Sequence, residues 1–319
     1  QISALTALGA DIIGVQERTT GENGWNSPMS SAGLVQAVYR ENHSSQGDGP
    51  AIWYKSSTVT VDATYDTALQ TGTLIGWDGS TVVNKAAVAA KVTVGGRQFY
   101  VVSTHLCWSA CADSNGSSFS AQREGQITTL LNWISTTLTG GLDVVILGDM
   151  NFGPDYPRNG GGLIKGMFTS TYTDLWNAGL TAGTATTPWG DRAGDGTVDM
   201  TPADIGTQTT GTRTHDTRRI DYMFLNNSAT VLSLSAISVP DSRAQCSVAL
   251  VAGGLFPHCP DTDSSQRWDV TDDQGVRMSD HNPTVVVLNI TPAPPPTGNG
   301  GVKQRGNTTR RGKVTTRPE

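Results

Sequence analysis

Residues 142–151 read LDVVILGDMN, and this stretch decides the fold of the chain. Positions 142–147 hold three β-branched residues and two leucines, which predicts a short strand buried on both faces. We expect Gly148 to end the strand and to let the backbone turn sharply. Asp149 and Asn151 follow, so both polar side chains are expected where a buried strand opens into a loop. In α/β proteins, ligands bind at this carboxyl end of the sheet.

Asp149 and Asn151 allow two interpretations. In the functional one, a carboxylate and an amide two positions apart face one ligand, such as a hydrated cation or a phosphate. In the structural one, they form a helix cap or an Asx-turn. Residues 148–151 alone do not decide between the two, so the rest of the chain has to.

The remaining secondary structure follows from hydrophobic periodicity. A pair of glycines, Gly95 and Gly96, predicts a hairpin, and the apolar spacing of Ser120–Leu138 predicts the best helix, with Ser120 as its N-cap. We expect the end of a helix at residues 1–10, capped by Gly9, and a short helix at 169–180. Strands are predicted at residues 11–16, 34–39, 51–54, 58–62, 86–94, 98–104, 142–147, 219–224, 231–239 and 284–288. Loops or irregular connections are predicted at residues 18–33, 63–85, 106–118, 181–217 and 240–278.

Polar residues of catalytic type lie at or near the ends of several of these strands. Buried strands more often run into Gly, Pro, Asn or Ser turns, so five separate sites of this kind are not easily accidental. The residues concerned are Glu17, His105, Asp149, Asn151, Asp280 and His281, while the fifth site, Asp221, lies within the predicted strand 219–224.

Five short motifs contain these residues, namely QE at 16–17, STHL at 103–106, GDMN at 148–151, RIDY at 219–222 and SDHNP at 279–283. In this order they resemble the endonuclease/exonuclease/phosphatase (DNase I-like) superfamily. That superfamily includes nucleases, deadenylases, inositol polyphosphate 5-phosphatases and bacterial sphingomyelinases. The resemblance covers residues 1–290. It implies a four-layer α/β sandwich with two packed, mostly antiparallel β-sheets flanked by helices, and phosphoester hydrolysis at a Mg²⁺-dependent site.

The chemistry of a phosphodiester fits these residue types. A hard cation offsets the anionic charge and is bound by one or two carboxylates, for which Glu17 is the first choice and Asp280 the second. Mg²⁺ is the expected ion, with Mn²⁺ or Ca²⁺ as alternatives. His281 suits the role of base toward the attacking water, and the resemblance makes Asp221 the carboxylate that fixes its tautomer.

The remaining three residues are expected around the phosphate. Asp149 and Asn151 would position the nucleophile and a phosphoryl oxygen, and His105 would donate to a phosphate oxygen as negative charge builds. Each prediction has a structural alternative: an exposed loop acid for Glu17, a turn histidine for His281, a salt bridge to Arg218 or Arg219 for Asp221, and a core or surface histidine for His105.

Charge divides the chain at residue 291. The net charge is −6, but residues 291–319 hold six basic residues and one acidic residue, so residues 1–290 carry −11. An acidic body does not suit tight, metal-free binding to a polyanion, but it suits a site whose carboxylates hold a divalent cation. We therefore expect a catalytic domain at residues 1–290 and a disordered Pro/Gly/Thr-rich basic tail or linker at 291–319.

Four cysteines and a composition rich in Ser, Thr, Gly and Asn favour a secreted or extracellular protein with two disulfides. We expect the pairs Cys107–Cys111 and Cys246–Cys259, with four reduced thiols as the alternative; neither spacing resembles a zinc motif. No run is long enough to span a membrane. In the superfamily a first strand carries an active-site Asn, and this sequence starts after it, so we expect a fragment that lacks one strand and one site residue.

Three functions remain open at this stage. The first is a secreted, Mg²⁺-dependent nuclease that works as a monomer on a phosphodiester of nucleic acid. The second is a sphingomyelinase-like enzyme or an inositol-phosphate phosphatase, which would place a lipid head group or inositol phosphate in the site. The third is a non-catalytic binding module on the same fold.

Overall fold

The computed structural model of the chain describes residues 9–16, 26–41, 49–69, 74–75, 85–107, 112–113, 119–153, 156–159, 161–186, 221–238 and 284–292. The strands are β1 (Ile12–Val15), β2 (Leu34–Tyr39), β3 (Ala51–Lys55), β4 (Thr60–Ala68), β5 (Leu74–Ile75), β6 (Ala86–Val94), β7 (Arg97–His105), β8 (Ala112–Asp113), β9 (Asp143–Asp149), β10 (Tyr172–Asp174), β11 (Ala185–Thr186), β12 (Asp221–Asn226), β13 (Leu232–Ser238) and β14 (Val285–Ile290). The helices are α2 (Asn26–Ser31), α3 (Phe119–Thr137), α4 (Gly166–Thr169) and α5 (Leu175–Ala182).

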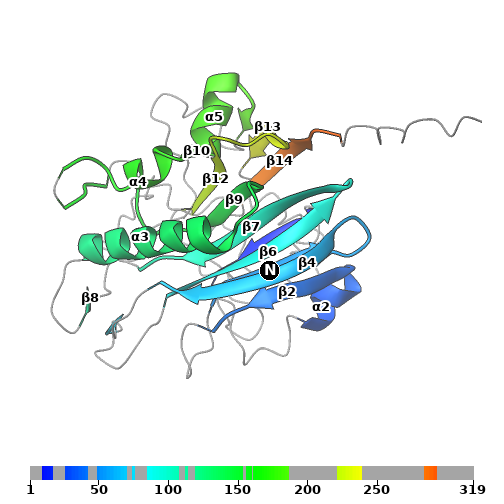
Figure 1. Cartoon of the computed structure of the whole chain (residues 1–319), viewed down its shortest axis with the longest axis horizontal. Helices are drawn as coiled ribbons and strands as arrows, with labels where there is room; N and C mark the ends of the chain where they lie inside the picture. Colours follow the sequence, from blue (N-terminus) through cyan, green and yellow to red (C-terminus); the bar gives the residue numbers. More distant parts are fainter. Residues whose placement is uncertain are drawn as a thin grey trace, which may run out of the picture.

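A six-stranded sheet forms the centre of the molecule, with the order β10-β12-β9-β7-β6-β4 (Figure 1). The predicted strand at 142–147 is β9, and all seven of its residues are buried. β7 and β9 run parallel and are joined through α3, whereas the other neighbours in this sheet are antiparallel. The predicted α/β class, with mostly antiparallel sheets flanked by helices, is confirmed.

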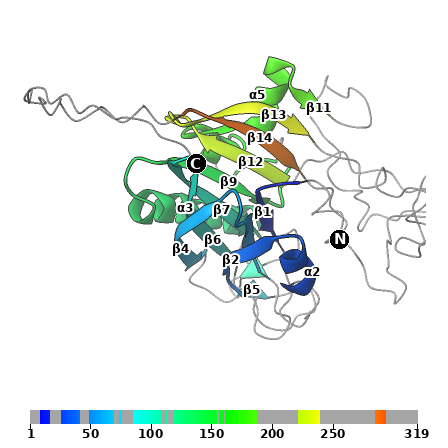
Figure 2. The same ribbon diagram turned by 90° about the vertical axis from the view of Figure 1, so that its right-hand side faces the viewer.

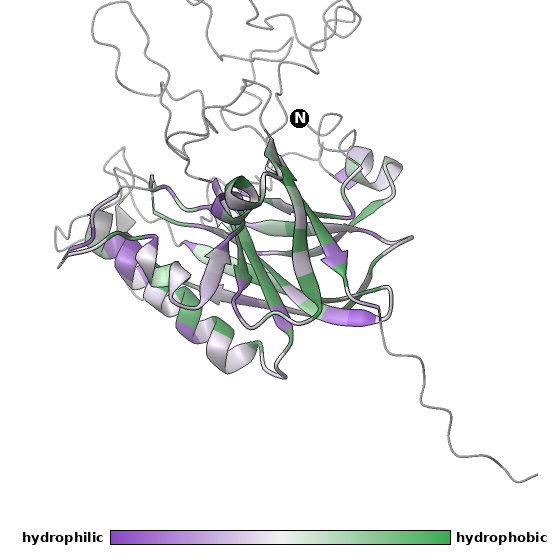
Figure 3. Ribbon diagram, turned by 90° about the horizontal axis from the view of Figure 1, so that it is seen from above, coloured by the Kyte–Doolittle hydropathy of each residue, from purple (hydrophilic) through white to green (hydrophobic). Residues whose placement is uncertain are grey.

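The two faces of this sheet bury different partners. On one face, Val102, Ile146 and Phe224 belong to a core shared with Ile127 and Leu130 of α3. On the other face, alternate residues of the same strands pack against the smaller sheets, in a core that also contains residues of β3 and β13. Figure 2 shows α3 on one side of the central strands, with β1, β2 and α2 on the other. The long helix mixes hydrophilic and hydrophobic residues, while the central strands are mostly hydrophobic (Figure 3).

Two three-stranded sheets, β1-β3-β2 and β11-β13-β14, supply strands to the second face. At Gly14 in β1, a Cβ atom would lie 1.9 Å from Leu147 Cδ1 of β9, so the side chain of Leu147 fills the space that a larger residue at position 14 would need. A two-stranded pair, β5-β8, completes the described strands. The four-layer arrangement remains a prediction.

Several predicted connections contain regular structure. The predicted loop at 18–33 includes α2, which begins with Asn26-Ser27-Pro28 and buries Met29 completely. Pro28 fits the first turn of a helix, where its missing N–H costs nothing. The predicted connection at 63–85 was also wrong in part, because β4 continues to Ala68 along the whole length of β6, and β5 follows it.

The predicted helix at 169–180 was only half correct. Tyr172–Asp174 form an edge strand beside β12, and the helix α5 begins after Asp174, whose carboxylate caps it by accepting from Trp176 N. The strand residues have side chains that also fit a helical pattern, so pairing with β12 decides their conformation. β8 interrupts the predicted loop at 106–118, β11 interrupts the one at 181–217, and α3 begins at Phe119, ahead of the predicted N-cap Ser120.

Two further details of the predicted strands change. The strand at 284–288 was expected to be buried, but β14 is an edge strand and leaves Val287 52% exposed. Gly148 does not end β9, because the strand continues through it to Asp149.

Some predictions concern residues outside the described ranges. They include the helix at residues 1–8, the irregular segment 240–278, the tail from residue 293 and three of the four cysteines, so the disulfide pairs and the domain boundary stay predictions. Cys107 is described and buried. Among the helices of the described ranges, none has the length and apolar character needed to cross a membrane.

Candidate functional site

Three of the predicted site residues meet at one end of the central sheet. In the register of the strands, His105 at the end of β7 is the partner of Asp149 at the end of β9, and Asp149 is the partner of Asp221 at the start of β12. Side chains at paired positions of adjacent strands project from the same face. The face concerned is the one covered by the smaller sheets, so apolar residues along these strands give way to an imidazole and two carboxylates at the edge.

His105 and Asp149 are both buried, and His105 Nε2 lies 3.6 Å from Asp149 Oδ2. A third buried group, Lys85, directly precedes β6, and its Nζ atom is 3.3 Å from both ring nitrogens of His105. An ammonium at equal distance from both nitrogens does not point along a lone pair of either one. The contact is therefore mainly electrostatic, and it places a cation as well as a carboxylate next to the same imidazole.

Gly148 brings β7 and β9 close together beside these groups. A Cβ atom at this position would lie 1.9 Å from the carbonyl oxygen of Thr104, the residue before His105. Glycine is therefore required for a close approach of two backbones, and not for the turn that the sequence suggested.

Asn151 follows in a left-handed conformation with φ 54°. Its backbone N donates to Asp149 Oδ1 at 2.7 Å, which is the Asx-turn named as the structural alternative. Its side-chain Nδ2 donates to the carbonyl oxygen of Leu106 at 2.9 Å. The Asx-turn occupies Asp149 Oδ1, while Oδ2 faces His105, so the structural and functional interpretations are compatible.

Apolar residues anchor the loop that follows β9 on the opposite face of the sheet from Asp149. Met150 and Phe152 are buried in the core beneath α3, and the ring of Phe152 lies 5.0 Å from that of Tyr222. Tyr222 stacks in turn with Phe224, with 5.4 Å between ring centroids. The alternation between anchored apolar residues and Asp149 and Asn151 holds the polar pair in a defined place.

The end of β1 reaches the same edge. Gln16 Nε2 donates to Ser103 Oγ at 3.0 Å, two residues before His105. Glu17, Asp280 and His281 lie outside the described residues, so their positions are not part of this geometry.

The groups at this edge match the donor preference of a hard cation, since carboxylate and amide oxygens are what Mg²⁺ binds. Asp149, Asp221 and Asn151 supply such oxygens. Within the described ranges, no three His, Cys, Asp or Glu side chains gather closely enough to hold a metal ion. The two expected metal ligands, Glu17 and Asp280, lie outside those ranges.

The order of the motifs and the geometry of this edge agree with a comparison of sequences. Residues 2–281 match the profile of the Endonuclease/Exonuclease/phosphatase family. The chain belongs to this family. Members of the endonuclease/exonuclease/phosphatase family hydrolyse phosphoester bonds, and the family generally uses divalent metal ions. No curated protein matches the chain.

Solved structures share the fold at low sequence identity. The endonuclease/exonuclease/phosphatase from Bacteroides vulgatus has a TM-score of 0.55 and 14% identity, over 91% of this chain and 88% of that one. A humanized D. rerio TDP2 has a TM-score of 0.55 and 16% identity, over 90% and 88%. D. rerio TDP2 complexed with a single strand DNA product has a TM-score of 0.52 and 15% identity, over 90% and 89%. These similarities show the fold alone.

Lys85 is the site residue that sequence reasoning missed. It lies one residue before a predicted strand and inside a predicted long connection, where a lysine is ordinarily solvated. Its position ahead of five consecutive buried residues, Ala86–Ala90, was the available signal. A lysine that enters a fully buried strand has to find a partner inside the protein.

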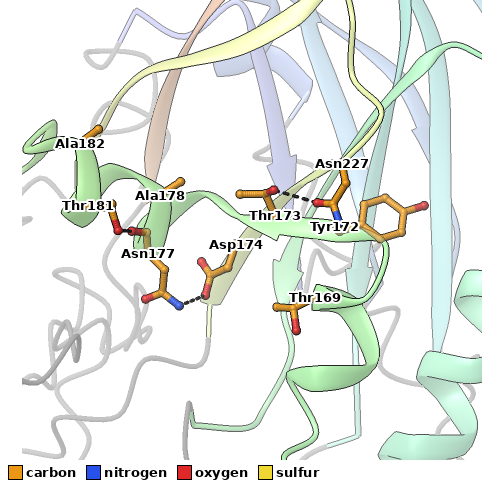
Figure 4. A pocket seen from close by; sticks show the side chains of 9 residues that line it. All are labelled: Thr169, Tyr172, Thr173, Asp174, Asn177, Ala178, Thr181, Ala182 and Asn227. Atoms are coloured by element: carbon orange, nitrogen blue, oxygen red, sulfur yellow. Dashed lines mark hydrogen bonds between the residues drawn. The ribbon is translucent and has the colours of Figure 1, made fainter.

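A shallow hollow lies at the other end of β12, away from Asp221 (Figure 4). Its walls come from β10, α5 and the residues beside them, and its polar groups bond to one another, as in the contact of Thr173 Oγ1 with Asn227 Oδ1 at 2.8 Å. Burial raises the pKa of Tyr172 in its wall to about 12. The hollow shares no residue with the candidate site, and its polar side chains bond to one another, so we assign it no functional role.

Proposed function

We propose that this member of the endonuclease/exonuclease/phosphatase family is a secreted, Mg²⁺-dependent phosphodiesterase that hydrolyses nucleic acid. The observation that carries the proposal is the register of His105, Asp149 and Asp221 on one face at one sheet edge. Strands far apart in sequence deliver these side chains together. A binding module would have no chemical need for a buried imidazole flanked by Lys85 and Asp149.

The roles follow from the chemistry of phosphate hydrolysis. His105, together with the adjacent Lys85 ammonium, would stabilise negative charge on a phosphoryl oxygen in the transition state. Asp149 and Asn151 would orient the attacking water, since the Asx-turn fixes both relative to the sheet. His281, with its tautomer fixed by Asp221, would take the proton of that water as the new P–O bond forms and the ester P–O bond breaks.

Glu17 and Asp280 are the proposed ligands of Mg²⁺, with Mn²⁺ or Ca²⁺ as alternatives. A bound divalent cation would offset the charge of the phosphate and polarise its oxygens. The contact of Gln16 with Ser103 supports this role of Glu17, because it ties the preceding residue to the strand that ends in His105.

Nucleic acid is favoured over a lipid by the surface of the described residues. The large apolar side chains exposed there are Val35, Leu163 and Val287, one from each of three segments far apart in the sequence, so no single described segment presents an apolar face. A lipid-directed enzyme needs such a face to dock on a membrane. The oligomeric state is proposed to be a monomer, and the location extracellular.

A substrate panel tests this function. Plasmid DNA, RNA, sphingomyelin vesicles and inositol phosphates are each incubated with the protein in Mg²⁺ and in EDTA, and product is quantified. We expect Mg²⁺-dependent cleavage of DNA or RNA that His105→Ala and Asp149→Ala reduce at least about 100-fold. Cleavage of only sphingomyelin or inositol phosphates would assign the other enzyme class, and activity that survives EDTA would refute the metal dependence.

A further inference from the structure

The chain leaves β7 at His105, and the next backbone groups are fixed by the loop that follows β9. Leu106 N donates to the carbonyl oxygen of Asp149 at 2.9 Å. Leu106 O accepts from Asn151 Nδ2 at 2.9 Å. Both backbone polar groups of the buried residue Leu106 are therefore bonded to Asp149 and Asn151, on which the proposed chemistry depends.

The next residue is fixed by α3 instead. Cys107 N donates to Gln126 Oε1 at 2.8 Å, and Arg123 Nε donates to Cys107 O at 2.6 Å. All three residues are buried, with Arg123 and Gln126 each 1% exposed. Burying the polar groups of an arginine and a glutamine is unfavourable unless these groups form hydrogen bonds. Here both side chains bond to Cys107, two positions after His105.

The same part of α3 also contacts the loop that follows Asn151. The guanidinium of Arg123 lies over the ring of Tyr156, with 4.9 Å from Cζ to the ring centroid. The adjacent Glu124 accepts from Asn159 N at 2.6 Å and from Arg158 Nε at 3.4 Å. One turn of helix therefore bonds both loops that leave the candidate site.

We propose that Arg123 and Gln126 are positioning residues that fix His105 relative to Asp149 by holding the backbone of Cys107 against α3. This inference rests on the proposed function, because it assigns a catalytic consequence to the position of His105. Misplacing a reacting group by an ångström costs far more in rate than in stability. The two hydrogen bonds from Arg123 and Gln126 to the backbone of Cys107 are called the bracket below. Loss of the bracket should therefore lower turnover by more than its effect on folding explains.

Gln126→Met tests the bracket, because methionine matches glutamine in volume but offers no acceptor of comparable strength to Cys107 N–H. We expect kcat to fall at least about tenfold while KM changes less than about twofold. Gln126→Glu keeps the acceptor oxygen and should restore kcat to within about threefold of the parent. Leu138→Ala, at a buried residue directly after the C-terminal end of α3, is the control for general destabilisation and should leave kcat of the folded protein unchanged.

A double-mutant cycle with His105→Ala separates positioning from a general structural role. If Gln126 acts through His105, Gln126→Met should lower kcat by less than about twofold in the His105→Ala background. An equal loss in both backgrounds would overturn the proposal. Should Gln126→Met fail to fold, Gln126→Asn, whose amide is one methylene too short, takes its place in the cycle.

Amide hydrogen exchange gives a readout that does not need activity. We expect exchange of the Cys107 amide to accelerate at least about tenfold in Gln126→Met, while amides within α3 exchange as in the parent. Unchanged exchange at Cys107 would refute the bracket whatever the enzyme does. Faster exchange at Cys107 in a protein that hydrolyses no phosphoester would instead retain the bracket and reject the proposed function and the positioning role with it.

Discussion

Strand β9 carries a buried aspartate at each end, and the two are used differently. Asp143 accepts three backbone hydrogen bonds, from Thr230, Val231 and Leu232, at 2.9, 2.8 and 2.6 Å. Asp149 accepts one from Asn151 through Oδ1 and turns Oδ2 toward His105 at 3.6 Å. At the Asp143 end, called the structural end below, the carboxylate accepts the hydrogen bonds of a turn in the backbone. At the Asp149 end, called the functional end below, the carboxylate faces the ionisable side chain of His105 and is paired in register with Asp221. Such a group of ionisable side chains is expected at a chemical site.

Asp149→Asn should give the largest effect and tests the functional end. The substitution keeps the shape of the side chain and one oxygen for Asn151 N, but it removes the negative charge beside His105. We expect kcat/KM for a nucleic acid substrate to fall about 10³-fold with little change in the melting temperature. A variant that keeps full activity would show that Asp149 is as structural as Asp143.

Gly148→Ala should give the next largest effect and acts on the spacing between strands. Its Cβ would meet the carbonyl oxygen of Thr104 at 1.9 Å, so β7 has to move away from β9. We expect a loss of about 3 kcal/mol in the free energy of unfolding, measured by urea titration, together with a fall in activity of the folded fraction. Gly140→Ala, at a glycine whose Cβ would meet nothing within 4 Å, controls for the loss of glycine at positive φ.

Asp143→Asn tests the structural end and should have a smaller effect. It should lower stability and leave activity unchanged, whereas Asp149→Asn should lower activity and leave stability unchanged. One oxygen is replaced by an NH₂ group that faces backbone donors, so at least one buried N–H loses its acceptor. We expect the free energy of unfolding to fall by about 2 kcal/mol while kcat/KM of the folded protein stays within twofold of the parent. A large loss of activity without a loss of stability would break the contrast between the two aspartates.

Alkaline titration should give the smallest effect and again reports on the structural end. Tyr172 pairs with Asn226 there, and burial raises its pKa to about 12. The folded state therefore keeps the phenolic proton at pH values where an unfolded tyrosine, with a pKa of about 10, has lost it. Stability from this group is complete below pH 10 and is lost as the pH rises toward 12. Tyr172→Phe should reduce this alkaline decline in denaturant titrations, and a decline that is identical in both proteins would contradict the assignment.

Local patterns predicted the elements whose residues are buried on both faces. The apolar run of β9 and the Gly95-Gly96 hairpin between β6 and β7 are confirmed, because continuous burial and a two-residue turn leave few alternatives. α2 was missed because its Asn, Ser and Pro residues are typical of loops, whereas in the structure the helix packs through the buried side chain of Met29. β10 was missed because its strand conformation depends on pairing with β12.

The residues of the candidate site also differ in whether local sequence or tertiary packing reveals them. His105 and Asp149 were visible because each follows a predicted buried strand, and Asp221 because it lies in the motif RIDY. The structure brings the three together. Lys85 and Gln126 were not visible, because a lysine before a strand and a glutamine on a helix look ordinary in sequence. Their partners lie 20 and 19 residues away, so only the packing of β6 and α3 against β7 reveals them.

The connection of β7 to β9 through α3 has a consequence for the order of folding. Because the strands are parallel, the chain must cross the sheet between them, and the helix that makes this crossing packs on the same pair. β7, α3 and β9 therefore form a unit of elements close together in the sequence, and the parallel pairing of its two strands places His105 beside Asp149. Its contacts close shorter loops than those between β9 and β12, so we expect this unit in the folding nucleus, with φ-values in β7 and β9 above those in β12. The pairing of His105 with Asp149 would then be among the first parts of the candidate site to form, and Asp221 of β12 would join it later.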